Sequence, residues 1–422
     1  MLTFNCPECG QSYETDDDVA GKKVKCEKCG NSFKAPEAET PVPGEKSEES
    51  AELKVEGSAG EENPAPSKTV EEPAAPNVAP VKMGIDFKLP EPEPWTDEDM
   101  ERIGHLKEAN DKIVGQIRKA LVGQDDVVRL TMIGLFSQGH CLLMGVPGLG
   151  KTLLVSTLSK SLSLKFRRVQ FTPDLMPSDI TGTEVIQEDK ESGERNFRFI
   201  EGPIFTNMLL ADEINRTPPK TQAALLEAMQ EKQVTVGGLR RELEPPFFVL
   251  ATQNPIEQEG TYPLPEAQMD RFMFLINVGY PTEAEEKKIL AMTTSGYMPE
   301  IEPVLEQQEI IKLQELVRKV QIDDEVVNYI VRLVRRSRCH QEGAPDFIEK
   351  WVSWGAGPRA SQYLVLGAKA VAVLDGRNKV KMEDVGVVAH AVLGHRIQPN
   401  FVAEAEGITS LKIVDELLKA EA

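Results

Sequence analysis

From Thr96 onward the chain alternates two hydrophobic patterns that together predict an α/β domain. Helical signals begin at Thr96, a capping residue followed by acidic residues and then by apolar side chains at Met100, Ile103 and Leu106. Short apolar runs then alternate with helical stretches, which is typical of a largely parallel sheet lying between helices. The predicted strands are His140–Met144, Phe166–Phe171, Thr206–Ala211, Phe247–Thr252 and Phe272–Val278.

Beyond Tyr280 the pattern is helical only. Thr282 and Glu285 are spaced as a capping box, which marks the start of a helix. The helices predicted after it are Ile310–Val320, Glu325–Arg338, Pro358–Leu374 and Met382–Leu393. We therefore predict an α/β core over residues 96–281 and a second, all-helical domain over residues 282–422.

Residues 35–95 have a composition that does not suit a packed domain. They contain eleven prolines and fourteen acidic residues against five basic ones, and Phe87 and Trp95 are their only aromatic residues. Such a segment cannot bury enough apolar surface to offset its chain entropy. We predict a disordered, acidic linker that tethers the first residues to the rest of the chain.

The first 34 residues contain two CxxC pairs with the spacing of a zinc ribbon. Cys6 and Cys9 form the first pair, Cys26 and Cys29 the second, and sixteen residues separate the pairs. Four thiolates at this spacing make a closed tetrahedral site for a structural Zn²⁺. So short a segment cannot build an adequate core, so we expect the metal to supply most of its folding energy. Redox-active pairs are the alternative, but no βαβ pattern surrounds them.

Composition and charge narrow the function classes. The chain of 422 residues has a formal net charge of −20 and a pI near 4.9, so its surface as a whole repels nucleic acid phosphates. No apolar run approaches the roughly 20 residues that cross a bilayer, and the start lacks the features of a secretory signal. The expectation is a cytoplasmic protein that does not span a membrane.

A glycine-rich loop after the first predicted strand predicts a nucleotide phosphate site. The segment from Gly145 to Thr152 reads GVPGLGKT, which fits GxxxxGK[ST], and it lies between a strand and a helix as that mechanism requires. Backbone N–H groups of the loop and the helix N-terminus bind phosphates, while Lys151 contacts the β- and γ-phosphates and Thr152 binds Mg²⁺. The residues predicted to bind ATP are Gly145, Val146, Pro147, Gly148, Leu149, Gly150, Lys151, Thr152 and Leu153.

Two later strands end in polar residues that complete this chemistry. Asp212 and Glu213 end an apolar strand sixty-one residues after Lys151, at the sheet edge where open α/β sheets bind ligands. Asp212 suits the Mg²⁺ shell, and Glu213 suits activation of the attacking water. Asn254 ends the next strand and is either an orienting group for that water or a turn residue before Pro255. Together these motifs predict an NTP hydrolase.

The same motifs resemble the MoxR family of AAA+ ATPases over about residues 106–420. The segments that carry the resemblance are GVPGLGKT, LLADEINR, ALLEAMQEKQVTV, ATQNP, LPEAQMDRF and GAGPRAS. The resemblance implies Walker A roles for Lys151 and Thr152, Walker B roles for Asp212 and Glu213, and a first-sensor role for Asn254. The family's usual GASPRA stands here as GAGPRA, and this change spares the arginine. A five-stranded AAA+ core with a helical lid is the implied fold.

The resemblance also implies roles for two arginines. Arg359 looks like the second sensor, and its place in the first turn of a predicted helix makes sense if the γ-phosphate of its own chain faces it. Arg271 looks like the arginine finger that a neighbouring subunit receives. The residues alone leave Arg271 open, because it also follows the short helical piece Glu266–Asp270, where a cation is a good C-terminal cap.

An arginine finger implies a ring, a hexamer by analogy with the family. The resemblance implies a protein client and a partner with a von Willebrand A domain. It also implies that two predicted hairpins handle the substrate: one over Thr183–Gln187 and Asn196–Ile200, the other turning at Gly237 and Gly238. Solvated surface loops are the alternative for both hairpins. Two other functions stay open: a nucleic-acid-linked ATPase that uses the zinc ribbon and Arg240-Arg241, and the motor subunit of a metal chelatase.

Overall fold

The computed structural model describes residues 2–5, 12–15, 23–26, 28–29, 32–34, 95–188, 195–256, 260–296 and 299–421. The chain divides into two compact units, residues 1–85 and 86–422. In the first unit, β1 (Leu2–Asn5) pairs antiparallel with β2 (Ser12–Thr15), and β3 (Lys23–Lys25) pairs antiparallel with β4 (Ser32–Lys34). The predicted linker, apart from Trp95, lies outside the described residues.

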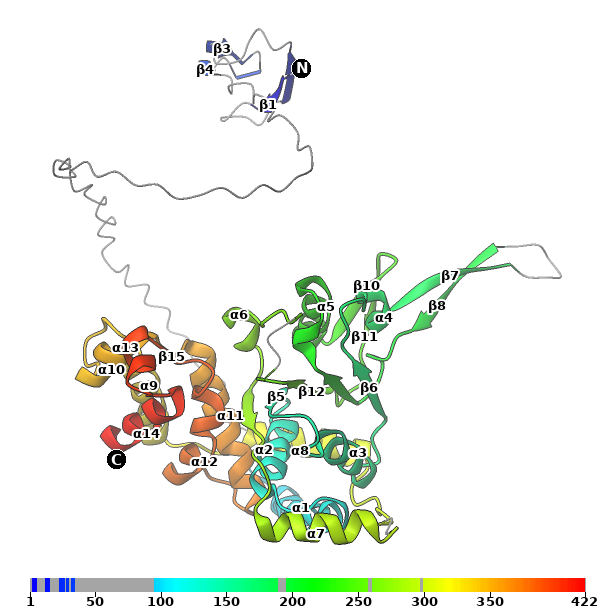
Figure 1. The fold of residues 1–422 in the computed structure, drawn as a ribbon, viewed down its shortest axis with the longest axis vertical. Coiled ribbons are helices and arrows are strands. Elements are labelled where there is room, and N and C mark those ends of the chain that lie inside the picture. The colour runs from blue at the N-terminus through cyan, green and yellow to red at the C-terminus, as the bar shows by residue number, and fades with distance from the viewer. Residues whose placement is uncertain are drawn as a thin grey trace, which may run out of the picture. The chain divides into compact units, whose positions relative to one another are not determined.

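The second unit is built on a five-stranded parallel sheet in the order β13-β5-β12-β9-β6 (Figure 1). Its strands are β5 (Cys141–Met144), β6 (Phe166–Gln170), β9 (Met208–Asp212), β12 (Phe248–Gln253) and β13 (Phe274–Asn277). Each strand overlaps one that the hydrophobic pattern predicts. The prediction of a parallel α/β core is confirmed.

Side chains alternate between the two faces of this sheet, so each face has its own core. Cys141 and Leu143 of β5 pack into one cluster, while Leu142 between them packs into the other. The first cluster also contains residues of α1, α2 and α3, and the second contains residues of α5. The helices of this part are α1 (Asp97–Ala120), α2 (Asp125–Phe136), α3 (Lys151–Ser161), α4 (Pro177–Thr181), α5 (Pro219–Glu231), α6 (Glu266–Met269) and the 3₁₀ turn Ile214–Arg216.

Two antiparallel hairpins leave the core. Strands β7 (Gly182–Glu188) and β8 (Arg195–Glu201) form the longer one, which projects from the core in Figure 1. The shorter one joins β10 (Gln233–Val236) to β11 (Leu239–Glu242) through Gly237 and Gly238. Both glycines have positive φ, +60° and +78°, which two-residue hairpin turns require. Both predicted hairpins are confirmed.

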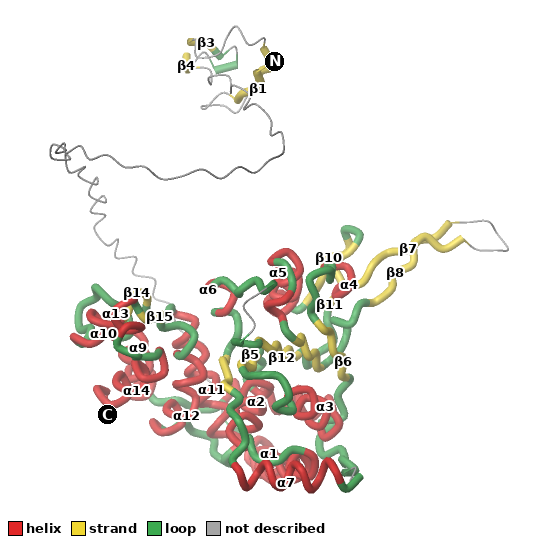
Figure 2. Tube along the Cα trace, in the orientation of Figure 1, coloured by secondary structure: helices red, strands yellow, loops and turns green. Residues whose placement is uncertain are grey.

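The region after residue 282 is mainly helical, and its helix α11 packs against α1 and α2 of the core (Figure 2). The capping boxes that start α1 at Thr96 and α7 at Thr282 are both present. The helices are α7 (Glu283–Thr294), α8 (Gln307–Lys319), α9 (Asp324–Arg336), α10 (Asp346–Trp351), α11 (Pro358–Leu374), α12 (Met382–Leu393), α13 (Phe401–Ala405) and α14 (Ser410–Glu421).

The expectation that this region is all-helical is wrong in one detail. A short antiparallel pair joins β14 (Val352–Trp354) to β15 (Gln398–Pro399). Strands of three and two residues are too short to produce a period-two pattern that stands out from the helices around them. In the part of the chain that the structure describes, no helix is long and apolar enough to cross a bilayer.

Candidate active site

The phosphate loop joins β5 to α3 at the carboxyl edge of the sheet. Gly148 and Gly150 have φ of +85° and +75°, the left-handed region that a tight glycine loop needs. Lys151 is the first residue of α3, and its ammonium donates to the carbonyl of Gly145 in the same loop. Burial lowers the pKa of Lys151, and the carboxylates of Asp212 and Glu213 oppose that shift. The loop is shaped to receive an anion at the N-terminus of α3.

A cavity of about 430 Å³ opens over this loop and contains most of the predicted nucleotide-binding side chains. Asp212, Glu213 and Asn254 reach it from the carboxyl ends of β9 and β12, which flank each other in the sheet. Arg168 of β6 and Thr252 of β12 line it too, and sequence reasoning missed both. The full lining is Pro147, Gly148, Leu149, Gly150, Lys151, Thr152, Leu153, Arg168, Asp212, Glu213, Thr252 and Asn254.

Asp212 is held by two neighbours from adjacent strands. The hydroxyl of Thr252 donates to its Oδ1 at 2.6 Å, and the guanidinium of Arg168 forms an ion pair with its Oδ2 at 2.6 Å. The Thr152 hydroxyl and the Asp212 carboxylate face one cavity and are hard oxygen donors, as Mg²⁺ prefers. The residues present therefore fit Mg²⁺, which would neutralise phosphate charge between them. In this structure the guanidinium of Arg168 is paired with the Asp212 carboxylate.

Glu213 is held in an unusual backbone conformation beside Asp212. Its φ is +58°, and its N–H donates to Thr252 Oγ1 at 2.8 Å. Its carboxylate accepts a hydrogen bond from Gln170 Nε2 at 2.5 Å and forms an ion pair with Arg216 at 3.1 Å. Left-handed backbone at a residue other than glycine is uncommon and tends to occur at functional sites. The carboxylate is thus aimed into the cavity, with amide and guanidinium donors around it.

The turn that one interpretation of Asn254 predicts is confirmed, and its role as an orienting group stays a prediction. Asn254 is buried and lines the nucleotide cavity. Its Oδ1 accepts the N–H of Ile256 at 3.2 Å, and this hydrogen bond closes a turn around Pro255. The turn fixes the amide at the end of β12, beside the carboxylates of β9. That position suits an orienting group for water.

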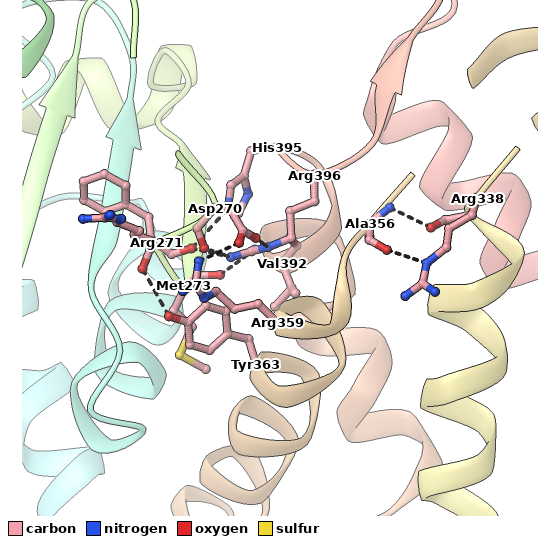
Figure 3. Close-up of polar contacts among 12 residues, drawn as sticks. Asp270, Arg271, Met273, Arg338, Ala356, Arg359, Tyr363, Val392, His395 and Arg396 are labelled. Atoms are coloured by element: carbon pink, nitrogen blue, oxygen red, sulfur yellow. Dashed lines mark hydrogen bonds and ion pairs between the residues drawn. The ribbon is translucent and has the colours of Figure 1, made fainter. Parts of the chain in front are cut away.

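Arg271 and Arg359 lie at the other edge of the sheet. Arg271 precedes β13, and the N–H of Met273 donates to the carbonyl of His140, the residue just before β5, at 2.7 Å. The phosphate loop follows the other end of β5. At roughly 3.3 Å per residue, the length of β5 places the Arg271 segment about 15 Å from the phosphate loop. Arg359 of α11 forms an ion pair with Asp270 at 2.7 Å, which places it at the same edge (Figure 3).

This placement corrects one expectation. Arg359 does not face the γ-phosphate of its own chain, because it is bound to Asp270 at the edge opposite the phosphate loop. Neither Arg271 nor Arg359 is among the described residues that line the nucleotide cavity. The sequence motif identified both arginines, but the topology that separates them from the loop depends on how the helical region packs.

A third arginine, Arg396, joins them. It is 5% exposed, forms an ion pair with Asp270 Oδ1 at 2.8 Å, and lies with its guanidinium carbon 5.1 Å from the centre of the Tyr363 ring. Burial lowers the pKa of Arg396, and the Asp270 carboxylate opposes that shift. Nothing in the local sequence around Arg396 indicates this role. Asp270 is therefore shared by Arg359 and Arg396, one on each carboxylate oxygen.

The predicted zinc ligands are only partly within the described residues. Cys6 and Cys9 lie outside them, whereas Cys26 is buried and Cys29 is exposed. Within the described ranges, no group of three or more His, Cys, Asp or Glu side chains is placed to hold a metal ion. Because two of the four thiols are not described, the zinc site stays a prediction.

Comparison with known families matches the two parts of the second unit. The family described as "ATPase family associated with various cellular activities (AAA)" matches residues 140–274, and an AAA lid domain matches residues 348–417. The first range runs from the start of β5 to β13, so it contains the phosphate loop, both acidic residues and Arg271. The second contains Arg359 and Arg396.

Individual proteins match over most of this chain. The Bacillus subtilis protein YeaC, whose function is uncharacterized, is 44% identical over 73% of this chain and 93% of its own length. Chaperone MoxR1 of Mycobacterium tuberculosis is 41% identical over 74% of this chain and 81% of its own. A crystal structure of a candidate ATPase from Cytophaga hutchinsonii aligns with a TM-score of 0.71 at 40% identity, covering 76% of this chain and 97% of that one.

Proposed function

Because the chain belongs to the MoxR family of AAA+ ATPases, we propose that it works as a ring of identical subunits, a hexamer, whose ATP hydrolysis remodels or helps mature a protein client. The observation that carries this proposal is the separation of the site into two edges. One chain supplies the phosphate loop and the carboxylates at one edge of the sheet and the arginines at the other. A ring brings the arginine edge of one subunit to the nucleotide edge of the next.

In this ring each active site takes residues from two chains. Lys151 and Thr152 bind the phosphates and Mg²⁺ together with Asp212, Glu213 accepts the proton of the attacking water, and Asn254 orients that water. The neighbouring subunit supplies Arg271 and Arg359, whose charges stabilise the transferred phosphoryl group. Because the arginines arrive only on assembly, a lone subunit hydrolyses ATP slowly.

The longer hairpin supports a protein client. Ile186, Phe197 and Ile200 are 63%, 74% and 50% exposed on β7 and β8, so the hairpin presents apolar side chains to solvent. Exposed apolar surface of this kind suits contact with another protein. The relative named Chaperone MoxR1 agrees with such a role. We also propose a partner that carries a von Willebrand A domain, which the family resemblance implies.

The nucleic acid alternative receives less support from the shorter hairpin. Arg241 forms an ion pair with Glu184 at 3.2 Å, and its guanidinium carbon lies 3.7 Å from the centre of the Phe199 ring. These contacts join the two hairpins and occupy a charge that a phosphate backbone would need. No observation favours a metal-chelatase motor over a chaperone. The zinc ribbon and a cytoplasmic location remain part of the proposal, supported by the sequence alone.

Capture of the client tests the proposal. Tagged Glu213→Gln protein should bind ATP and Mg²⁺ but hydrolyse it very slowly, so client-bound rings accumulate and can be purified from native lysate. The matched control is Lys151→Ala, which should not bind ATP and should lose the client. Recovery of the same protein by Glu213→Gln and by Lys151→Ala would contradict an ATP-dependent protein remodeller. Recovery of nucleic acid in place of protein would contradict it as well.

A further inference from the structure

The segment that carries Arg271 is held by the lid of the same chain. All four consecutive backbone carbonyls from Asp270 to Met273 accept hydrogen bonds from lid side chains within residues 348–417. These bonds are Arg396 to Asp270 O at 2.8 Å, Tyr363 to Arg271 O at 3.1 Å, Arg396 to Phe272 O at 2.7 Å, His395 to Phe272 O at 3.2 Å and Arg396 to Met273 O at 3.2 Å. Figure 3 shows these side chains converging on one turn.

Arg396 supplies most of these bonds and uses its whole guanidinium to do so. Besides the three carbonyls of the segment, it donates to Asp270 Oδ1 at 2.8 Å and to the carbonyl of Val392, in the preceding helix α12, at 2.5 Å. That makes five bonds, and a guanidinium has five N–H donors. A lysine at this position could not make the same set, because its ammonium has three donors at one point.

Arg359 is fixed to the same frame from the other side. Its guanidinium pairs with Asp270 Oδ2 at 2.7 Å, so one carboxylate bridges Arg359 and Arg396. The loop before Arg359 is anchored as well, because Arg338 Nε donates to the carbonyl of Ala356 at 2.9 Å. A Cβ at Gly355 would lie 2.3 Å from the carbonyl oxygen of Ser337, so this loop needs glycine to approach the end of α9.

We propose that Arg396 is a positioning residue that makes the lid, Arg271 and Arg359 move as one body. The lid of one subunit then sets where both arginines stand at the nucleotide of the next subunit. This inference rests on the proposed function, in which the arginines act on the neighbouring site. Arg396 itself does not touch nucleotide: it is buried and saturated by its own chain.

Separate measurements of turnover and binding test the inference. Arg396→Met removes all five bonds, and because a misplacement of about 1 Å costs on the order of 10²-fold, we expect kcat to fall by about that factor. The Kd of a fluorescent ATP analogue should stay within about twofold, because the phosphate loop lies at the other edge of the sheet. Arg396→Lys should not restore kcat. If the Kd of the ATP analogue rises by the same factor as kcat falls, the inference is overturned.

A milder variant covers the case in which Arg396→Met does not fold. Tyr363→Phe removes only the hydroxyl that donates to the Arg271 carbonyl. One hydrogen bond is worth about 1 kcal/mol, so kcat should fall about fivefold while the ATP Kd stays unchanged and the thermal unfolding temperature falls by only a few degrees. Tyr329→Phe, in a tyrosine of α9 outside this cluster, is the matched control and should have the wild-type kcat. A wild-type kcat for Tyr363→Phe would overturn the inference.

Mixed rings separate failure of this inference from failure of the proposed function. A 1:1 mixture of Arg396→Met and Glu213→Gln should regain activity, because the second subunit offers well-placed arginines to the intact Glu213 of the first. The reference is the same mixture made with Arg271→Ala in place of Arg396→Met. If the reference recovers and the Arg396 mixture does not, Arg396 acts on its own site and the inference fails. If neither recovers, the proposed function fails with it.

Discussion

The two edges of the central sheet differ in how their residues come together. At the nucleotide edge, Lys151 follows the loop after β5, Asp212 is the last residue of β9, and Asn254 directly follows β12, so short stretches of chain place them. At the arginine edge, Asp270 is paired with residues 89 and 126 positions away, Arg359 and Arg396. The first edge is a product of local motifs, and the second is a product of tertiary packing between core and lid.

The electrostatics differ in the same way. At the nucleotide edge the carboxylates line a cavity, and Arg168, which pairs with Asp212, has a side chain that is 47% exposed. At the arginine edge the cation of Arg396 is almost fully buried and every donor is used. We therefore expect the nucleotide edge to change its partners when ligand binds, while the arginine edge keeps its own contacts and moves as a unit.

Removing Arg271 should give the largest loss of kcat that distinguishes the arginine edge from the nucleotide edge. An arginine finger is worth about 10³- to 10⁵-fold in kcat, so Arg271→Ala should lose that much turnover. Its ATP Kd should stay within about twofold of the wild type, whereas Lys151→Ala should lose binding as well. Stopped-flow binding and steady-state hydrolysis measure both quantities. Arg240→Ala, an exposed arginine on the shorter hairpin, is the control; a large loss of ATP binding in Arg271→Ala would contradict the separation.

Acid should weaken the arginine edge through His140. This buried histidine accepts the N–H of Val249 at Nδ1 and donates from Nε2 to the carbonyl of Met229, and its burial lowers its pKa to about 4. The unfolded chain, with a histidine pKa near 6.5, binds more protons than the folded one between these values. Stability is therefore present above about pH 6.5 and is lost as the pH falls towards 4.

The expected loss is about 3 kcal/mol in the free energy of unfolding of residues 86–422. Urea unfolding at a series of pH values should show this dependence in the wild type and a weaker one in His140→Gln. The exposed His105 provides the control, because His105→Gln should leave the pH dependence unchanged. An identical slope in the wild type and in His140→Gln would show that His140 is not the group responsible.

A smaller effect is expected at the nucleotide edge from Arg168. Its guanidinium occupies the carboxylate that Mg²⁺ would use, so Arg168→Gln should lower the Mg²⁺ concentration needed for nucleotide binding. An exposed ion pair is worth up to about 1 kcal/mol, which corresponds to about two- to fivefold. Mn²⁺ binding followed by electron paramagnetic resonance measures this without turnover. Arg167→Gln, on the opposite face of β6, is the control; weaker metal binding in Arg168→Gln would mean that Arg168 supports the metal site.

The smallest effect on hydrolysis is expected from the first unit. Cys26→Ser should abolish the binding of about one Zn²⁺ per chain, as elemental analysis of the purified protein would measure. Turnover should change by less than about twofold, because residues 1–85 form a compact unit of their own. Full zinc content in the Cys26→Ser protein would contradict the four-cysteine site.

The sequence predicted what depends on local pattern. The five strands, the helix cap at Thr96, the capping box at Thr282 and the turn at Gly237-Gly238 each follow from periodicity or from the demands of a single turn. The phosphate loop, Asp212, Glu213 and Asn254, which line the nucleotide cavity, follow from local motifs in the same way. Arg168, Gln170 and Thr252 were missed because a polar residue near the end of a strand has no distinctive signal until the neighbouring strand is known.

The arginine edge could not be predicted in the same way. The motif around Arg359 identified that residue but assigned it to the wrong edge, since nothing in the sequence says how α11 packs on α1 and α2. Arg396 lies just past the end of α12 and resembles an ordinary solvated helix-end cation until its five acceptors are seen. Long-range hydrogen bonds of this kind are set by tertiary packing, which local periodicity does not encode.

The measurement that tests the two-edge account most directly is ATP hydrolysis by mixed rings of Arg271→Ala and Glu213→Gln subunits. Each variant should be nearly inactive alone, and in a random 1:1 ring about a quarter of the interfaces pair an intact Glu213 with intact arginines. We therefore expect recovery towards that fraction of the wild-type rate. A mixture of Arg271→Ala with Arg359→Ala should stay inactive, because both lesions lie on the same edge. No recovery in the first mixture, with co-assembly shown by co-purification of two tags, would contradict the account.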